Sequence, residues 1–145
     1  MFIRRFHITD IGQVCELLNT ELGKQISVDD LSVTVADMLN SDDYAIFVAE
    51  KNESIVGFIG VHFGLAFEIK GKVMRIIALA VKESCQHQGI GTELLKVAEK
   101  CAAESGACVI GVNSGLQRID AHSFYEKQKF SKKGYSFTKN IELTE

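Results

Sequence analysis

The chain of 145 residues carries a formal net charge of −3 and is 46% hydrophobic, a composition typical of globular proteins. This acidic balance argues against a basic nucleic-acid-binding surface and is compatible with a cationic substrate. The longest stretch without a formal charge, residues 54–67, is shorter than the roughly 20 apolar residues that span a bilayer. The sequence therefore predicts neither a nucleic-acid partner nor a membrane partner.

The N-terminus and the cysteines indicate the compartment. Residues 1–7 include charges with no apolar run behind them, which argues against a signal peptide and predicts a cytoplasmic protein. The cysteines form no Cys-x-x-Cys pair and do not cluster with histidine: they are Cys15, Cys85, Cys101 and Cys108. We therefore expect neither a disulfide framework nor a metal site. The length is most simply that of a single domain, residues 1–145.

Two capped helices are predicted after a short strand at Phe2–His7. Asp10 followed by Gln13 has the spacing of a capping box, in which side chains satisfy the first N–H groups of a helix, and Ser27 with Asp30 repeats it. Apolar residues at helical spacing follow each cap: Ile11, Val14, Leu18 and Leu22, then Leu31, Val35, Met38 and Leu39, with the second helix ending near Asn40.

A β-rich segment comes next. Residues 44–49 and 55–62 are predicted strands, and the polar residues 51–54 between them predict a hairpin with a four-residue turn. Glycines in and after the second strand indicate bulges or close backbone approach; they are Gly57, Gly60 and Gly64. The apolar segment 63–67 is expected to pack in the core, with the alternative that it lines the mouth of a substrate site. Gly71 then turns the chain into a third strand, 73–81.

The segment from Cys85 to Leu95 carries the most information about function. It joins an apolar strand to a stretch with helical spacing, so it reads as strand, short polar loop, helix. Gly89 and Gly91 let the backbone turn sharply and approach a ligand, and the first N–H groups of a helix favour an anion. The two glycines fit either a phosphate or pyrophosphate site or a plain glycine-rich turn before a surface helix. The nucleotide-triphosphate loop and the third glycine of the dinucleotide fingerprint are absent.

The last third of the chain completes a mixed sheet. A helix at about 89–105 is expected to end at Gly106, followed by a buried strand at 108–113 and a helix at about 119–128. Residues 130–138 are predicted to form a last strand. The predicted order is β-α-α-β-β-β-α-β-α-β, an α/β fold in which strands 73–81 and 108–113 are parallel neighbours.

Two motifs resemble one family. Gln86-His-Gln-Gly89-Ile-Gly91 resembles the Gln/Arg-x-x-Gly-x-Gly/Ala signature of the GCN5-related N-acetyltransferases (GNAT), and Ala121-His-Ser-Phe-Tyr125-Glu-Lys-x-x-Phe130 resembles a second motif of that family. The strand ending in Leu79-Ala-Val81 and the order of elements are similar as well. The resemblance covers essentially the whole chain and is closest to small bacterial members.

The resemblance implies the GNAT fold and acetyl-CoA as the co-substrate, with no metal. In such proteins the strand at Leu79–Val81 splays from its parallel neighbour and pairs with the pantetheine arm, while the signature loop holds the diphosphate. The implied cofactor-binding residues are Leu79, Ala80, Val81, Gln86, His87, Gln88, Gly89, Ile90, Gly91, Thr92 and Asn113. The implied partner is an amine acceptor, a small molecule or a peptide, and a homodimer follows from family habit alone.

The implied reaction is direct attack of a primary amine on the thioester, with Tyr125 as the general acid that protonates the departing thiolate. Without the motif, Tyr125 would read as a half-buried aromatic of the last helix. Many members carry a glutamate on the strand 73–81 as the base, but Arg75 or a neighbour stands there in this chain. The proton route is therefore open between His62, Glu68, Glu83 and water.

Two further positions depart from the family pattern. Arg118 stands where asparagine is frequent, and we expect it to form an ion pair with Asp120; the alternative is a phosphate contact. Lys129 stands where glycine is usual, and lysine adopts a left-handed turn only at some cost. The sequence thus predicts an N-acetyltransferase. The alternatives are a catalytically weakened acyl-CoA-binding or sensor module and, less compatible with the loop, a nucleotide-binding regulator.

Overall fold

The computed structural model describes residues 1–142. Backbone contacts divide the chain into two compact units, Met1–Val112 and Asn113–Glu145. Within the described part of the chain, no helix has the length and apolar character that crossing a membrane requires.

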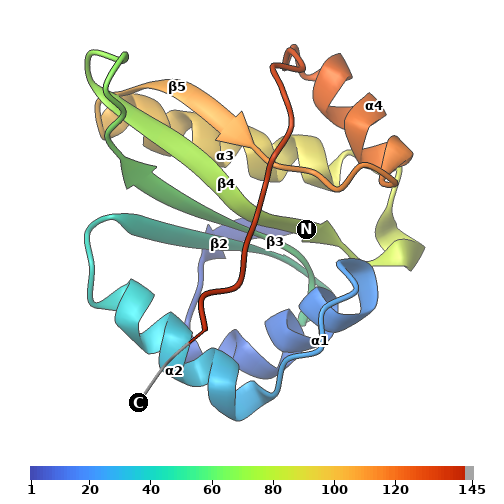
Figure 1. The fold of residues 1–145 in the computed structure, drawn as a ribbon. Coiled ribbons are helices and arrows are strands. Elements are labelled where there is room, and N and C mark those ends of the chain that lie inside the picture. Colours follow the sequence, from blue (N-terminus) through green and yellow to red (C-terminus); the bar gives the residue numbers. More distant parts are fainter. Residues whose placement is uncertain (143–145) are drawn as a thin grey trace. The chain divides into compact units, whose positions relative to one another are not determined.

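The first unit is built on a five-stranded mixed sheet with the order β1-β2-β3-β4-β5 (Figure 1). The strands are β1 (Phe2–Arg5), β2 (Tyr44–Lys51), β3 (Ser54–Gly64), β4 (Lys72–Val81) and β5 (Ala107–Val112). All neighbours are antiparallel except β4 and β5, which are parallel because α3 connects them. The predicted mixed α/β sheet is confirmed.

Helices cover both faces of this sheet (Figure 1). The helices are η1 (Ile8–Asp10), α1 (Ile11–Glu21), α2 (Val28–Leu39), η2 (Glu83–Cys85) and α3 (Ile90–Glu104). The α1 and α2 helices bury their apolar residues against one face in a cluster that includes Val14, Leu17, Leu31 and Val35 together with Val48 and Phe58 of the sheet. The α3 helix covers the other face.

The packing of α3 explains one of the glycines in β3. A Cβ atom on Gly57 would lie 3.1 Å from the carbonyl oxygen of Ala80 and 3.2 Å from a methyl of Leu94. Leu94 and its helical neighbour Leu95 are at most 1% exposed. The absent side chain therefore lets α3 lie directly on the sheet, which fixes the start of that helix beside the end of β4.

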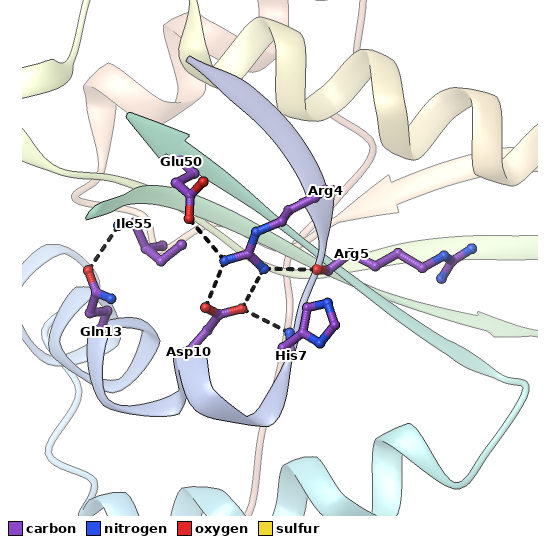
Figure 2. Close-up of polar contacts among 7 residues, drawn as sticks. All are labelled: Arg4, Arg5, His7, Asp10, Gln13, Glu50 and Ile55. Atoms are coloured by element: carbon purple, nitrogen blue, oxygen red, sulfur yellow. Dashed lines mark hydrogen bonds and ion pairs between the residues drawn. The ribbon is translucent and has the colours of Figure 1, made fainter. Parts of the chain in front are cut away.

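The two predicted helix caps have different outcomes. The Ser27 hydroxyl accepts a hydrogen bond from the Asp30 N–H at 3.1 Å, as predicted. The predicted capping box of Asp10 and Gln13 is wrong, because both side chains form hydrogen bonds with residues outside α1 (Figure 2). The Asp10 carboxylate accepts two bonds from the Arg4 guanidinium, at 2.8 and 2.9 Å, and Gln13 accepts from the Ile55 N–H at 2.9 Å.

The β2–β3 hairpin is tighter than predicted. Its strands extend to Lys51 and Ser54, so the turn has only Asn52 and Glu53, both with positive φ (51° and 64°). Two successive left-handed residues match the right-handed twist of the flanking strands. The predicted packing of segment 63–67 holds for Phe63, which is 5% exposed, but is wrong for Leu65 and Phe67, which are 84% and 110% exposed.

The edge strand β5 is also less buried than predicted. Cys108 and Val109 are exposed, because β5 pairs with β4 and has no second partner among the described residues of the sheet. Gly106, with φ 80°, closes the end of α3 as expected.

The second unit contains α4 (Ile119–Lys127). The Lys129 N–H donates to Glu126 and the Phe130 N–H to Tyr125, both at 3.0 Å, while Lys129 has φ 70°. This pattern is the Schellman motif, formed here with lysine at the left-handed position.

The last strand predicted at 130–138 is wrong, since these residues have no regular secondary structure. Tyr135 and Phe137 are 72% and 92% exposed. Without a buried face, alternating aromatic residues do not hold a strand in register.

Candidate active site at the open edge of β4

The β4 strand changes its pairing at Ile77. In the register with β3, Gly60 lies opposite Ala78 and Val61 opposite Ile76, so Ile77 is an extra residue that forms a bulge. The pairing of β4 with β5 ends at the same place, with Ile76 opposite Val112. A bulge bends its strand, and here it coincides with the separation of two parallel strands. Residues 78–81 thus pair with β3 alone, which is the splay that the family resemblance implies.

The open edge leads into the glycine loop and the start of α3. His87 (φ 62°) and Gly89 (φ 83°) both have left-handed backbones, and Gly89 is the N-cap residue of α3. The first hydrogen bond of the helical ladder is donated by the Glu93 N–H to the Gly89 carbonyl at 3.0 Å. The N–H groups of Ile90 and Gly91 therefore precede the helical ladder, at the positive end of the helix dipole. This geometry suits a phosphate group.

Side chains from distant elements hold this loop in place. Gln86 donates to the Val81 carbonyl at 3.0 Å and to the Glu21 carboxylate at 3.4 Å. The other oxygen of Glu21 accepts from the Glu83 N–H at 3.3 Å. Lys51 donates to the Gln88 amide oxygen at 3.2 Å. The signature loop is thereby connected to α1 and to β2.

A cleft of about 360 Å³ lies beside this end of β4. Its lining comes from α1, the start of β3 and the segment after β4: Gln13, Glu16, Leu17, Thr20, Glu21, Ser54, Ile55, Lys82, Glu83 and Ser84. Three of these residues are glutamates and one is a lysine, so the cleft has an acidic character.

Just before the open edge begins, Arg75 of β4 lies opposite His62 of β3, which in turn lies opposite Tyr44 of β2. The rings of Tyr44 and His62 are in contact, with centroids 4.8 Å apart. Arg75 is exposed and precedes the bulge by two residues. Of the residues considered as bases, His62 lies near the bulge, Glu68 lies in the β3–β4 loop, and Glu83 lies in η2 beyond the end of β4.

Tyr125 lies in α4 and is 9% exposed. Its ring contacts Phe124 and Phe130, with centroids 5.4 and 5.5 Å away. Burial raises the pKa of the phenol, and the charge of Arg118 opposes this effect. Within the described residues Arg118 forms no ion pair, so the expected pair with Asp120 is wrong.

Within the first unit, the structure brings together the predicted donor-binding residues of β4 and of the loop, Leu79–Val81 and Gln86–Thr92, whereas Asn113 and Tyr125 belong to the second unit. The contacts of Glu21 and Lys51 with the loop were not predicted, because each joins residues far apart in the sequence and has no local pattern. No group of three potential metal-ligating side chains occurs within residues 1–142.

Comparison with known proteins identifies the relatives of this fold. Residues 11–130 match the model of the acetyltransferase (GNAT) family. The chain is 29% identical over 128 residues to aminoalkylphosphonate N-acetyltransferase from Salmonella typhimurium, which covers 88% of this chain and 80% of that protein.

Two solved structures show the same fold. A transcriptional regulator from Bacillus halodurans matches with TM-score 0.87 and 22% identity, over 97% of this chain and 99% of that one. An aminoglycoside antibiotic 6′-N-acetyltransferase from Acinetobacter haemolyticus matches with TM-score 0.83 and 16% identity, over 98% and 100% of the two chains.

Proposed function

Because the chain belongs to the GNAT acetyltransferase family, which uses acetyl-CoA, we propose that it transfers an acetyl group from acetyl-CoA to the primary amine of a small molecule or peptide. The observation that carries this proposal is the open edge of β4, which runs from the bulge at Ile77 to the loop at Gln86–Gly91. An extended chain with amide groups can pair with such an edge as an added strand.

The proposed donor lies along this edge. The pantetheine arm pairs with Leu79–Val81, and the diphosphate is held by N–H groups between Gln88 and Thr92, with Gln86 and His87 alongside. From Ile77 to Val81 the strand advances by roughly 13 Å. The thioester is therefore expected near the bulge and the diphosphate near the helix. Asn113, directly after β5, is proposed as a further hydrogen-bond partner of the pantetheine arm.

In the proposed reaction, the amine nitrogen attacks the thioester carbonyl and the new C–N bond replaces the C–S bond. The departing thiolate receives the phenolic proton of Tyr125, and solvent restores that proton. At neutral pH the phenol carries its proton, because its pKa lies above the ordinary value of 10.0.

A base must take a proton from the ammonium group of the acceptor, because only the neutral amine attacks the thioester. Glu83 follows β4, at the end that holds the diphosphate in the proposed arrangement, so it is far from the thioester. His62 lies near the bulge and is therefore favoured over Glu83, with Glu68 and water as the alternatives.

The acceptor is proposed to be a small amine. The relative from Salmonella is named for aminoalkylphosphonates and the structural neighbour from Acinetobacter for aminoglycosides, and both are compounds with primary amines. A peptide amine is the second candidate.

The test is thiol release from acetyl-CoA with a panel of amines, comparing wild type, Tyr125→Phe and the control Tyr135→Phe. Tyr135 is 72% exposed, in the same unit. We expect turnover on at least one small amine, a roughly 100-fold lower kcat for Tyr125→Phe, and no change for the control. Tight acetyl-CoA binding without turnover on any amine would instead support an acyl-CoA-binding or sensor module.

A further inference from the structure

Arg75 is a cation without a counter-ion among the residues that the structure describes. Within residues 1–142, its guanidinium forms no ion pair. Its neighbour on β3 is His62, which shares its face of the sheet because directly opposite residues do so. Its neighbour on β5 is Gly111, which has no side chain, and the space where a Cβ atom would stand is open. Arg75 therefore faces open space on one side and a second basic residue on the other.

The His62 ring is held in a defined position. Tyr44 contacts it from β2, with ring centroids 4.8 Å apart. A Cβ atom on Gly64 would lie 3.1 Å from Cε1 of this ring, so the glycine makes room for it. No carboxylate lies within ion-pair distance of His62 in the described part of the chain. Among the described residues, the guanidinium of Arg75 thus has no acidic partner, an arrangement that an external anion would stabilise.

We propose that Arg75 binds an anionic group of the amine acceptor: a phosphonate, phosphate or carboxylate. This inference rests on the proposed function and narrows its acceptor class. A guanidinium presents a planar fork of donors that matches the oxygens of such groups in a bidentate manner. Arg75 stands two residues before the bulge, where the thioester is expected, so a short aminoalkyl chain joins its site to the reacting carbonyl.

The same geometry disfavours a polycationic acceptor. A polyamine or aminoglycoside would bring positive charge against Arg75 with no carboxylate there to compensate. Glu83 does not supply that compensation, because it lies eight residues after Arg75, beyond the end of β4, and Glu16 and Glu21 line the same cleft as Glu83. The fold thus separates the cationic end of the β4 edge from the acidic one.

The experiment compares 2-aminoethylphosphonate with n-butylamine and spermidine, in wild type, Arg75→Ala, Arg75→Lys and the control Lys72→Ala. Lys72 is an exposed cation on the same strand. Acetyl transfer gives kcat and KM, and calorimetric titration of 2-aminoethylphosphonate into the CoA-bound protein gives Kd without turnover. We expect Arg75→Ala to raise KM and Kd for the phosphonate about 10-fold or more. The values for butylamine should not change, and Arg75→Lys should restore part of the affinity.

Two results distinguish a failure of this inference from a failure of the proposed function. If the protein acetylates spermidine in preference to the phosphonate, and Arg75→Ala leaves this preference unchanged, the inference is wrong while the acetyltransferase function stands. If the phosphonate binds through Arg75 but no amine is acetylated, the binding site stands and the proposed function fails. Equal phosphonate affinity in wild type and Arg75→Ala overturns the inference whatever the activity.

Discussion

At the scale of single residues, the surroundings of Tyr125 and of Asp10 displace the pKa of each side chain. Burial raises the pKa of the Tyr125 phenol, against the opposing charge of Arg118. The hydrogen bonds from Arg4 lower the pKa of Asp10 despite its burial. The first displacement makes the Tyr125 phenol a weaker acid than a solvated tyrosine, and the second keeps a structural ion pair charged.

The pKa of Tyr125 can be measured directly. The chain has three tyrosines and no tryptophan, so the absorbance of tyrosinate reports on few groups. We expect one phenol to titrate above the ordinary value of 10.0 and to be missing in Tyr125→Phe. Because the charge of Arg118 lowers this pKa, Arg118→Ala should raise it further. A late-titrating phenol that persists in Tyr125→Phe would show that it belongs to another tyrosine.

The Arg4–Asp10 pair gives a stability prediction. Asp10 is 5% exposed, and its carboxylate also accepts from the His7 N–H at 2.8 Å. Since its folded pKa lies below 3.8, the pair stabilises the protein above that pH, and this contribution is lost as the pH falls through the lowered folded pKa.

We therefore expect Asp10→Asn to lower the free energy of unfolding by about 2 kcal/mol at pH 7. The difference from wild type should shrink as the pH falls through and below 4. Urea unfolding at several pH values measures the loss of stability and its pH dependence, and Asp42→Asn, at an exposed position, is the control. A loss independent of pH would contradict the electrostatic origin.

At the scale of elements, the C-terminal ends of α4 and α1 make contacts that bear on the proposed function. The Schellman motif after α4 brings Phe130 onto Tyr125, the hydrophobic contact that accompanies this motif. The last residue of α1, Glu21, contacts the signature loop through Gln86 and Glu83. Each helix end thus contacts residues that have a role in the proposed function.

Lys129 occupies the left-handed position of the motif with φ 70°. A glycine there would relieve the contact of Cβ with the backbone, so Lys129→Gly should raise the free energy of unfolding by about 1 kcal/mol. Lys129→Ala keeps the Cβ and should give no such gain. Thermal unfolding compares the two variants, and equal stabilisation by both would contradict the backbone explanation.

Glu21 is predicted to position the loop for the donor. Glu21→Gln weakens two hydrogen bonds that hold Gln86 and the Glu83 N–H, so KM for acetyl-CoA should rise several-fold with a smaller change in kcat. Glu16→Gln is the matched control on the same helix and in the same cleft. Glu21→Asp should recover part of the effect. A fall in kcat alone would argue for a different role of Glu21.

At the scale of the whole molecule, sequence patterns predicted the sheet, the capped second helix and the signature loop, because these features depend on local periodicity and on glycine. The Asp10–Gln13 cap was wrong because Arg4 and Ile55 compete for those side chains, and such contacts are set by the tertiary fold. The bulge at Ile77 likewise had no signal in its own sequence, since it is defined by pairing with β3. The prediction of a last strand was wrong because its aromatic residues are exposed and pack against no buried surface.

The central claim is that acetyl-CoA lies along the open edge of β4 and against the start of α3. Amide hydrogen exchange with and without acetyl-CoA tests it most directly. We predict added protection in residues 79–81 and 88–92, and none in the β1–β2 pair at the opposite edge of the sheet. Binding of acetyl-CoA without protection of these two segments would contradict the account.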